Sequence, residues 1–544
     1  MSIAATARER VSTFLTASIF DNPVVTKEFR TRMRGWKAFG VMGTYCLVMA
    51  AVLMIAYYFM AEEYSRRGMS SSSVYTARVS IGRDLFVVLA WAQTILLTLI
   101  APALSAGSVT QELERKTLEM LALSPLTAGR IVLGKQLADF MYTLILLACS
   151  LPLAGITLML GGISPAEIGI TFMLLAAWTF LLTCLGTMLS SLSKKTAIAS
   201  LSSFGLSIIY LIYASATGAA LMMMSYRGVG MSHMSLNPFM LLCPAWGPYG
   251  ALESATVCGV RVSIALASFT LHVAYGVLFL LVATSHVMHK PAERALPIRL
   301  MLIGITIYST WLGVGSVQTP PQKVWLSTMG ISLLAYMIVA AVFFSTGRIR
   351  KPLGQSMFSY AFSWRRVFKS DVGGAICFML LWTAIHYACQ GAAMHFQGKA
   401  QSLTFPHGYW TAYLRIGVSI LAVVVGMTCV GILASSLVRA RNSAAALVVL
   451  FAVVAFAGYG IIASYYAFWR SMGNLHPNQA LLQLAALWPV TPILSAAGTF
   501  SKGDAPRWIH SAWIITSLIY VLIGAASLLL AGKAHAKTGG VQEE

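Results

Sequence analysis

Apolar residues run along this chain in long blocks that short polar segments separate. We find twelve blocks of about 18–28 residues without a charge in their middles, and a helix needs roughly 20 such residues to cross a bilayer. The blocks lack the alternation of membrane-barrel strands, so helices must satisfy the backbone in hydrocarbon. The pattern predicts an all-α polytopic membrane protein with spans at 38–60, 85–106, 138–161, 167–192, 197–224, 262–286, 300–318, 324–345, 373–396, 412–437, 443–466 and 509–532.

Two distant stretches share one pattern, which indicates an internal repeat. GTMLSSLSKKTA (Gly186 to Ala197) follows the fourth predicted span, and GILASSLVRARN (Gly431 to Asn442) follows the tenth. GRIVLGKQLADF before the third span is echoed by WRRVFKSDVGG before the ninth. The pattern therefore predicts two pseudo-repeated six-helix halves that face the same way, related by an axis along the membrane normal.

The repeat divides the chain into three parts. Residues 1–37 form a basic, partly amphipathic N-terminal segment, 38–297 the first six-span half, and 298–544 a second, degenerate half. Before the last span of each half, an apolar outer segment is cut below spanning length by proline. These segments, 235–252 and 481–498, form half-helices, interfacial pieces or ordinary loops.

Composition and charge agree with a membrane protein and set its orientation. Hydrophobic residues make up 58% and charged residues 10%, with a mean hydropathy of +0.76, which no soluble core can bury. The net charge is +21. With the N-terminus inside, inner segments hold 26 of the 38 Lys and Arg residues, as the positive-inside rule requires. Both termini are therefore predicted in the cytoplasm, and the protein in the cytoplasmic (inner) membrane as a multi-pass protein.

The excess of positive charge also bears on partners and processing. Inner clusters at 30–34 and 348–351 are suited to anionic lipid head groups. Nucleic acid is not an expected partner, because no folded basic domain is indicated. Residues 1–37 lack the continuous apolar region of a signal peptide.

The cysteines do not indicate a metal site. Most lie inside predicted spans, where they act as small apolar packing residues. No CxxC pair and no His/Cys cluster is present, so neither a metal nor another cofactor is expected. Cys243 and Cys258 share one outer loop, and their spacing leaves a disulfide open without establishing it.

The most charged stretch lies between the second and third spans. Ser108 and Gln111 form an S-x-x-Q capping box, and apolar residues then follow helical spacing as far as Ser124 and Pro125. The stretch predicts an amphipathic helix over 108–123 along the inner face, followed by a second helix that leads into the third span.

GRIVLGKQ, at the start of that second helix, resembles a phosphate-binding loop. Gly129, Gly134 and Lys135 fit G-x-x-x-x-G-K, but Gln136 replaces the Ser or Thr that would hold Mg²⁺. The stretch between the glycines favours a helix, and no parallel-sheet pattern precedes it. We expect no nucleotide site here, and no nucleophile–base constellation appears elsewhere. The chain is therefore predicted to be no enzyme.

Two stretches resemble the ABC-2-type permeases, the membrane subunits of ATP-binding-cassette transporters. NPVVTKEFRTRMRG (Asn22 to Gly35) is similar to the amphipathic segment before their first span. ELERKTLEMLALSPLTAGRIVLGKQLA (Glu112 to Ala138) is similar to their loop after the second span. The resemblance covers about 20–290 well and 345–532 more loosely. The inner loop of the second half has no acidic helix, which departs from the pattern of the first half. The sequence therefore does not support equal coupling of both halves to the ATPase.

The resemblance implies a separate P-loop ATPase subunit that docks on the inner loops and drives transport, in an exporter. The helix over 108–123 would be the coupling helix, or in the alternative only an interfacial anchor. The implied residues for ATPase coupling are Glu112, Glu114, Arg115, Lys116, Glu119 and Arg130, and those of the N-terminal amphipathic segment are Asn22, Pro23, Lys27, Glu28 and Arg30.

Two other classes remain open. A secondary transporter of two six-span halves would carry ionisable residues at membrane depth, and His272 and His386 are the mid-span candidates. A non-transporting scaffold of an assembly or motility complex would need none. The substrate is not indicated by the sequence. One chain supplies both membrane halves, or two chains pair as a homo- or hetero-oligomer.

Overall fold

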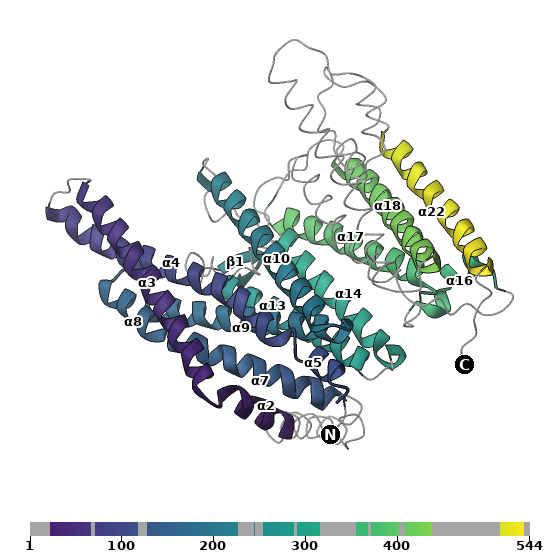
Figure 1. Cartoon of the computed structure of the whole chain (residues 1–544). Coiled ribbons are helices and arrows are strands. Elements are labelled where there is room, and N and C mark those ends of the chain that lie inside the picture. Colours follow the sequence, from purple (N-terminus) through teal and green to yellow (C-terminus); the bar gives the residue numbers. More distant parts are fainter. Residues whose placement is uncertain are drawn as a thin grey trace, which may run out of the picture. The chain divides into compact units, whose positions relative to one another are not determined.

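The computed structural model is mostly helical and falls into two compact units, Met1–Gln318 and Thr319–Glu544. Figure 1 shows the chain coloured along its sequence. The residues that the structure describes are 22–66, 71–117, 128–226, 244, 254–287, 291–315, 355–367, 372–400, 402, 409–437 and 512–537.

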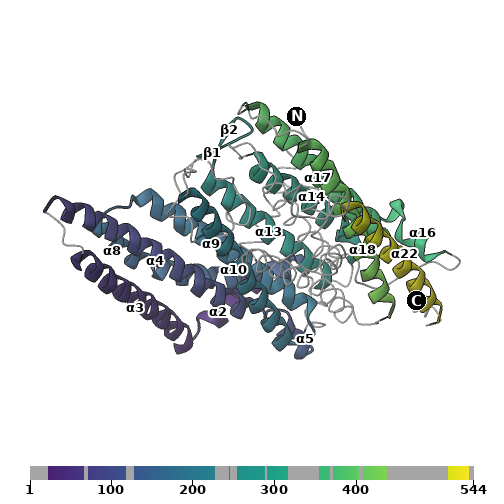
Figure 2. The same cartoon turned by 90° about the horizontal axis from the view of Figure 1, so that it is seen from above.

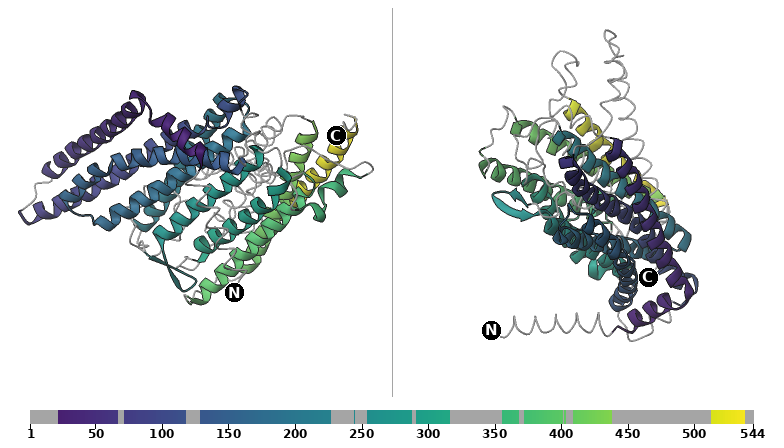
Figure 3. Two further views of the ribbon diagram at one scale, coloured as in Figure 1. Left: turned by 90° about the horizontal axis from the view of Figure 1, so that it is seen from below. Right: turned by 90° about the vertical axis from the view of Figure 1, so that its left-hand side faces the viewer.

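The first unit is a set of long helices that lie side by side (Figures 1 and 2). They are α3 (Trp36–Arg66), α4 (Ser71–Ser105), α7 (Ala128–Cys149), α9 (Pro165–Leu192), α10 (Thr196–Tyr226), α13 (Ile264–Val287) and α14 (Pro291–Gly315). Shorter helices are α2 (Pro23–Met33), α5 (Thr110–Glu114) and α8 (Leu151–Leu160). The chain bends between α2 and α3, so that α2 lies at an angle to the long helices (Figure 3).

Nine helices in the described part of the chain are long and apolar enough to cross a membrane. A tenth, α10, also coincides with a predicted span, although its described apolar portion, Thr196–Ile212, is shorter. The predicted spans 324–345 and 443–466 lie outside the described residues. The helical, polytopic character is thus borne out, whereas the number twelve and the repeat stay predictions.

Helix α9 lies at the centre of the first unit. Its Trp178 is fully buried, donates a hydrogen bond from Nε1 to Thr98 Oγ1 over 3.1 Å, and stacks on Tyr210. Leu181 and Leu182 pack with Leu271 of α13 in the same hydrophobic cluster. Burying a large apolar side chain of this kind stabilises by roughly 1.5–3 kcal/mol in water, but in lipid the close packing itself holds the helices together.

The third predicted span, 138–161, lies almost wholly within the candidate span Gly129–Leu160, but this span is broken at Ser150 into two helices. Helix α7 begins ten residues earlier and ends at Cys149, and α8 follows with Pro152 in its first turn. Proline has no N–H to continue the ladder. Ser150 stabilises the break: its hydroxyl donates to the Leu147 carbonyl and accepts from Gln93 Nε2, each over 2.6 Å.

A short β-hairpin that was not among the predicted elements precedes α13 (Figure 2). Strands β1 (Ser254–Val257) and β2 (Val260–Ser263) are antiparallel, and Val257 pairs with Val260. Cys258 and Gly259 both have positive φ, at 49° and 87°, as in a type I′ turn. Cys243 lies outside the described residues, so its pairing with Cys258 stays a prediction.

The start of α4 and the end of α8 approach each other closely at Gly82. A Cβ atom on Gly82 would collide with the backbone carbonyl oxygen of Gly161 and press on that of Thr157. Two helix backbones can come this close only where no side chain separates them.

Replacing Gly82 with alanine should therefore lower the stability of the protein by about 1–3 kcal/mol, because helix α4 must shift. Thermal unfolding of the purified protein in detergent measures the change. Gly155→Ala on α8 is the matched control: a Cβ there meets nothing within 4 Å, so this variant should unfold no earlier than the wild type. Equal losses in both variants would show that α4 and α8 are not in contact.

The second unit contains three long helices in its described part, α17 (Ala375–Ala400), α18 (Tyr409–Leu437) and α22 (Ala512–Lys537). Short helical pieces, α16 (Met357–Ala361) and η3 (Trp364–Arg366), come before α17. Helices α16, α17, α18 and α22 share one hydrophobic cluster around Tyr360, Ile376, Ile432 and Leu528. Helices α17 and α18 are joined by the stacked rings of Tyr387 and Tyr413, whose centroids lie 4.2 Å apart.

Candidate functional site

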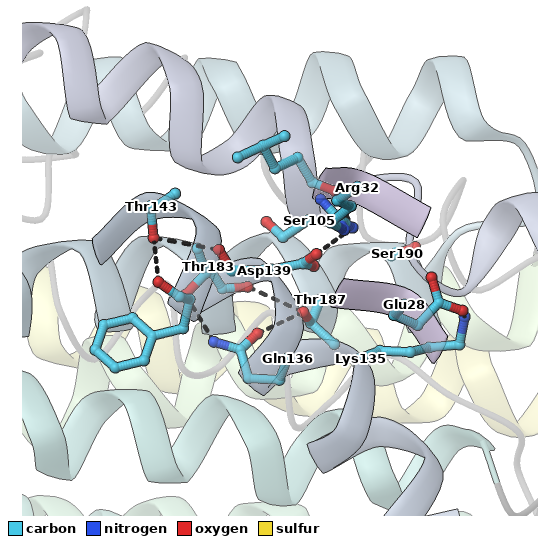
Figure 4. A network of polar contacts seen from close by, with 12 residues as sticks. Glu28, Arg32, Ser105, Lys135, Gln136, Asp139, Thr143, Thr183, Thr187 and Ser190 are labelled. Carbon is cyan, nitrogen blue, oxygen red and sulfur yellow. Dashed lines mark hydrogen bonds and ion pairs between the residues drawn. The ribbon is translucent and has the colours of Figure 1, made fainter. Parts of the chain in front are cut away.

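Buried charged and polar side chains gather where α2, α5 and the start of α7 meet the end of α9. We call this cluster the polar junction; Figure 4 shows most of it. Its residues are Glu28, Arg32, Glu112, Lys135, Gln136, Asp139, Thr183, Thr187 and Ser190.

Helix α2 is attached to α7 at its first residues. The Asn22 side chain caps α2, because Oδ1 accepts from the Val24 N–H over 3.1 Å, and Nδ2 donates to the Arg130 carbonyl over 2.7 Å. Pro23 occupies the first turn, where its missing N–H costs nothing. Gly134 lets the helices touch, since a Cβ there would lie 2.8 Å from that of Val24.

Lys135 of α7 joins two other helices through its ammonium group. Its Nζ lies 2.7 Å from Oε1 of Glu112 on α5 and 3.5 Å from Oε1 of Glu28 on α2. The Lys135 side chain is only 6% exposed, so water screens these pairs little. A buried cation of this kind is tolerated because carboxylates surround it.

Asp139, one turn further along α7, is completely buried and forms an ion pair with Arg32 of α2. Arg32 also donates from Nη2 to the Leu104 carbonyl at the end of α4, over 3.3 Å. Figure 4 shows the two ion pairs, Glu28–Lys135 and Arg32–Asp139, one turn apart. The sequence indicates no coupling role for Arg32 and none for Asp139.

Gln136 turns toward α9 instead. Its amide lies 2.6 Å from the Thr183 hydroxyl and 2.7 Å from the Thr187 hydroxyl, and all three side chains are buried. The prediction that GRIVLGKQ is helical is confirmed. Its Gly134 serves helix packing and its Lys135 an ion pair, so the stretch offers no bare N–H groups to a phosphate.

Helix α5 differs from the predicted helix over 108–123. It spans only Thr110–Glu114, and its start is capped by Ser190 of α9, whose hydroxyl accepts from the Val109 and Thr110 N–H groups, each over 3.0 Å. Ser108 therefore provides no cap. The helix ends because Lys116 has a φ of 57°, a left-handed conformation. Glu119 lies outside the described residues.

Glu114, at the end of α5, caps the neighbouring helix α10. Its carboxylate accepts from the Thr196 N–H over 2.8 Å and from the Thr196 hydroxyl over 2.9 Å. A carboxylate at a helix N-terminus is favourable because the unpaired N–H groups there carry partial positive charge. Helix α5 is thus linked to α7, α9 and α10 by three separate contacts.

The sequence-predicted residues separate into two groups. Glu28 and Glu112 turn into the polar junction, and Asn22 is buried at the start of α2. The others face outward or lie at the margin: Pro23, Lys27, Arg30, Glu114, Arg115 and Lys116 are exposed, and Arg130 is half-buried. Groups of three or more possible metal ligands are absent from the described residues.

Most of the first unit matches a known protein family. The model of the family described as "ABC-2 family transporter protein" matches residues 22–290. This part of the chain belongs to the ABC-2 transporter family. The match contains α2, α5 and the whole polar junction. A search among curated proteins found no match to the chain.

The family match over 22–290, together with the apolar helices, supports a multi-pass membrane permease of an ABC transporter. The resemblance that the sequence suggested is confirmed over 22–290. ABC-2 permeases are transport subunits, generally not themselves catalytic. They normally work with a separate ATP-binding subunit.

Proposed function

We propose that the protein is the permease of an ABC-type exporter in the cytoplasmic membrane. A separate P-loop ATPase, docked on its inner loops, supplies the energy. The observation that carries this proposal is the family match over 22–290, which includes the polar junction. In this reading neither half binds nucleotide, and the chain hydrolyses none.

Helix α5 acts as the coupling element in this proposal. It contacts α9 through Ser190, α7 through Lys135 and α10 through Thr196. A displacement of α5 is therefore passed to three spans, as in rigid-body switching. Glu112 and Glu114 serve as internal links in this mechanism, while Arg115 and Lys116 face the partner. Helix α2, bound to the same Lys135, steadies the start of α7.

The second half, 298–544, completes the membrane part as a degenerate repeat of 38–297. Helices α18 and α22 pack together in the second unit as α9 and α13 do in the first, which supports this correspondence. One chain then supplies both halves, although pairing with a second copy or a related chain stays open. Basic inner segments contact anionic lipids, and both termini face the cytoplasm.

The orientation can be tested by labelling single cysteines in intact cells and in inside-out vesicles. In a variant without native cysteines, a cysteine at Ser72 should react with a membrane-impermeant maleimide only from outside. One at Lys195, which is exposed in the turn between α9 and α10, should react only from inside. Labelling of both positions from one side would overturn the proposed topology.

A secondary transporter is the second candidate, and Asp139 favours it. A secondary transporter carries ionisable residues at membrane depth, and Asp139 is a fully buried carboxylate within a candidate span. Its pairing with Arg32 favours a structural role, because a coupling carboxylate must lose its charge in each cycle.

Purification of the tagged chain in mild detergent from the cells that make it separates the candidates. The ABC proposal predicts that a P-loop ATPase without spans of its own co-purifies in a fixed ratio. The secondary transporter predicts that no such chain is present, and that a pH gradient alone drives transport. Absence of any ATPase from the complex, in several detergents and after cross-linking in the membrane, would contradict the proposal.

A further inference from the structure

Both described carboxylates of α5 have partners within the protein, whereas the cations next to them are exposed. Glu112 is 14% exposed and turns to Lys135, and the Glu114 carboxylate is occupied by Thr196. Cationic side chains are exposed on the turn after α5 and on the turn between α9 and α10. They are Arg115, Lys116, Lys194 and Lys195, and we call these four residues the basic tip.

The basic tip is held in a defined shape. Lys116 adopts a left-handed backbone conformation, and the turn is closed by hydrogen bonds from Lys116 N to the Leu113 carbonyl and from Thr117 N to the Glu112 carbonyl. Such conformations persist in a non-glycine residue only where the surroundings enforce them, and they are often found at functional positions. Glu114 holds the second turn against the first through Thr196.

An apolar side chain lies among these charges. Leu113 on α5 is 40% exposed, next to Arg115 and Lys116. An apolar residue with a polar rim is typical of a protein–protein contact. A lipid leaflet surrounds the sides of a helical bundle, whereas α5 lies over the ends of α9 and α10, at Ser190 and Thr196. This position favours a protein partner over lipid.

We propose that the separate ATPase recognises the basic tip, and that its docking surface is acidic with an apolar recess for Leu113. This inference rests on the proposed function and specifies the chemistry of its partner surface. Of the coupling residues that the resemblance implies, it keeps Arg115 and Lys116 for docking and gives Glu112 and Glu114 an internal role. Complementary charge of this kind governs association rate and partner choice more than final affinity.

A carbodiimide, which joins amines to carboxylates without a spacer, tests this contact in membranes that contain the full chain. Peptide mapping should find Lys116, Lys194 or Lys195 joined to Asp or Glu residues of a P-loop ATPase. A variant with Arg115→Gln, Lys116→Asn, Lys194→Gln and Lys195→Gln removes the charge; Asn suits position 116 because it tolerates the left-handed conformation.

The amount of ATPase that co-purifies with this variant should be about tenfold lower than with the wild type at 0.1 M salt. As the salt concentration rises, the amount recovered with the wild type should fall toward that of the variant. The control removes exposed charges of α2 with Lys27→Gln, Arg30→Gln and Arg34→Gln, and should retain the ATPase. Size-exclusion chromatography verifies that both variants are folded.

Each other outcome is decisive. If the tip variant keeps the ATPase, or if the α2 variant loses it instead, the basic tip is not the docking surface while the proposed function stands. If the tip lysines are joined to no carboxylate of the ATPase although the complex is intact, the inference is also wrong. If the wild type carries no ATPase, both the inference and the proposed function fail.

Discussion

Replacing Arg32 with methionine should destabilise the protein by about 3–5 kcal/mol, the loss measured when one partner of a buried ion pair is removed. Asp139 is completely buried, so its carboxylate would lose its ion-pair partner in a site that water does not reach. Arg32 is 22% exposed, and the opposite change, Asp139→Asn, should cost less because the arginine can reach water. The apparent midpoint of thermal unfolding in detergent measures both.

Arg30→Met is the matched control for this prediction, because it removes the same side chain from the same helix at an exposed position. It should change the midpoint little. The double variant Arg32→Met with Asp139→Asn should recover most of the lost stability, since no charge is then left alone. If Arg30→Met and Arg32→Met behave alike, the ion pair with Asp139 does not form.

Lys135→Met should lower the stability of the protein by a similar amount, about 3–5 kcal/mol, because it also removes one partner of a buried ion pair. Two carboxylates, of Glu28 and Glu112, would lose their shared cation and would repel each other across a largely buried space. The change should also release α2 and α5 from α7, so limited proteolysis should cut near these helices sooner than in the wild type.

Lys27→Met serves as the control, because Lys27 is 71% exposed and its nitrogen lies 3.9 Å from the same Glu28 carboxylate. An exposed pair of this kind contributes little, about 0–1 kcal/mol. Adding Glu28→Gln and Glu112→Gln to Lys135→Met should restore stability. A triple variant that stays as unstable as Lys135→Met would show that Lys135 acts through packing and not through charge.

The long helices were predictable because each depends on an uninterrupted apolar run, which is a local property. The break at Ser150 was missed because Leu151 to Leu160 continues the apolar run, and hydropathy does not distinguish proline at a helix start from proline in a helix. The hairpin had a local signal too, since Cys258-Gly259 stands between Val257 and Val260 in an alternating stretch.

The candidate site was predictable only in part. Glu28 and Arg32 are four residues apart, as are Lys135 and Asp139, and these spacings match two helices that pair opposite charges. The sequence shows both spacings without showing that α2 lies against α7. The early end of α5 was not predictable, because its cap comes from Ser190, about eighty residues further along the chain.

The central claim is that the chain moves substrate without a motor of its own. ATP turnover in proteoliposomes tests it most directly, with the purified chain alone and with the ATPase that co-purifies from its membranes. The chain alone should show only background hydrolysis, and the reconstituted pair should hydrolyse ATP at a rate that falls when the phosphate-binding lysine of the partner is replaced. Sustained hydrolysis by the chain alone would contradict the account.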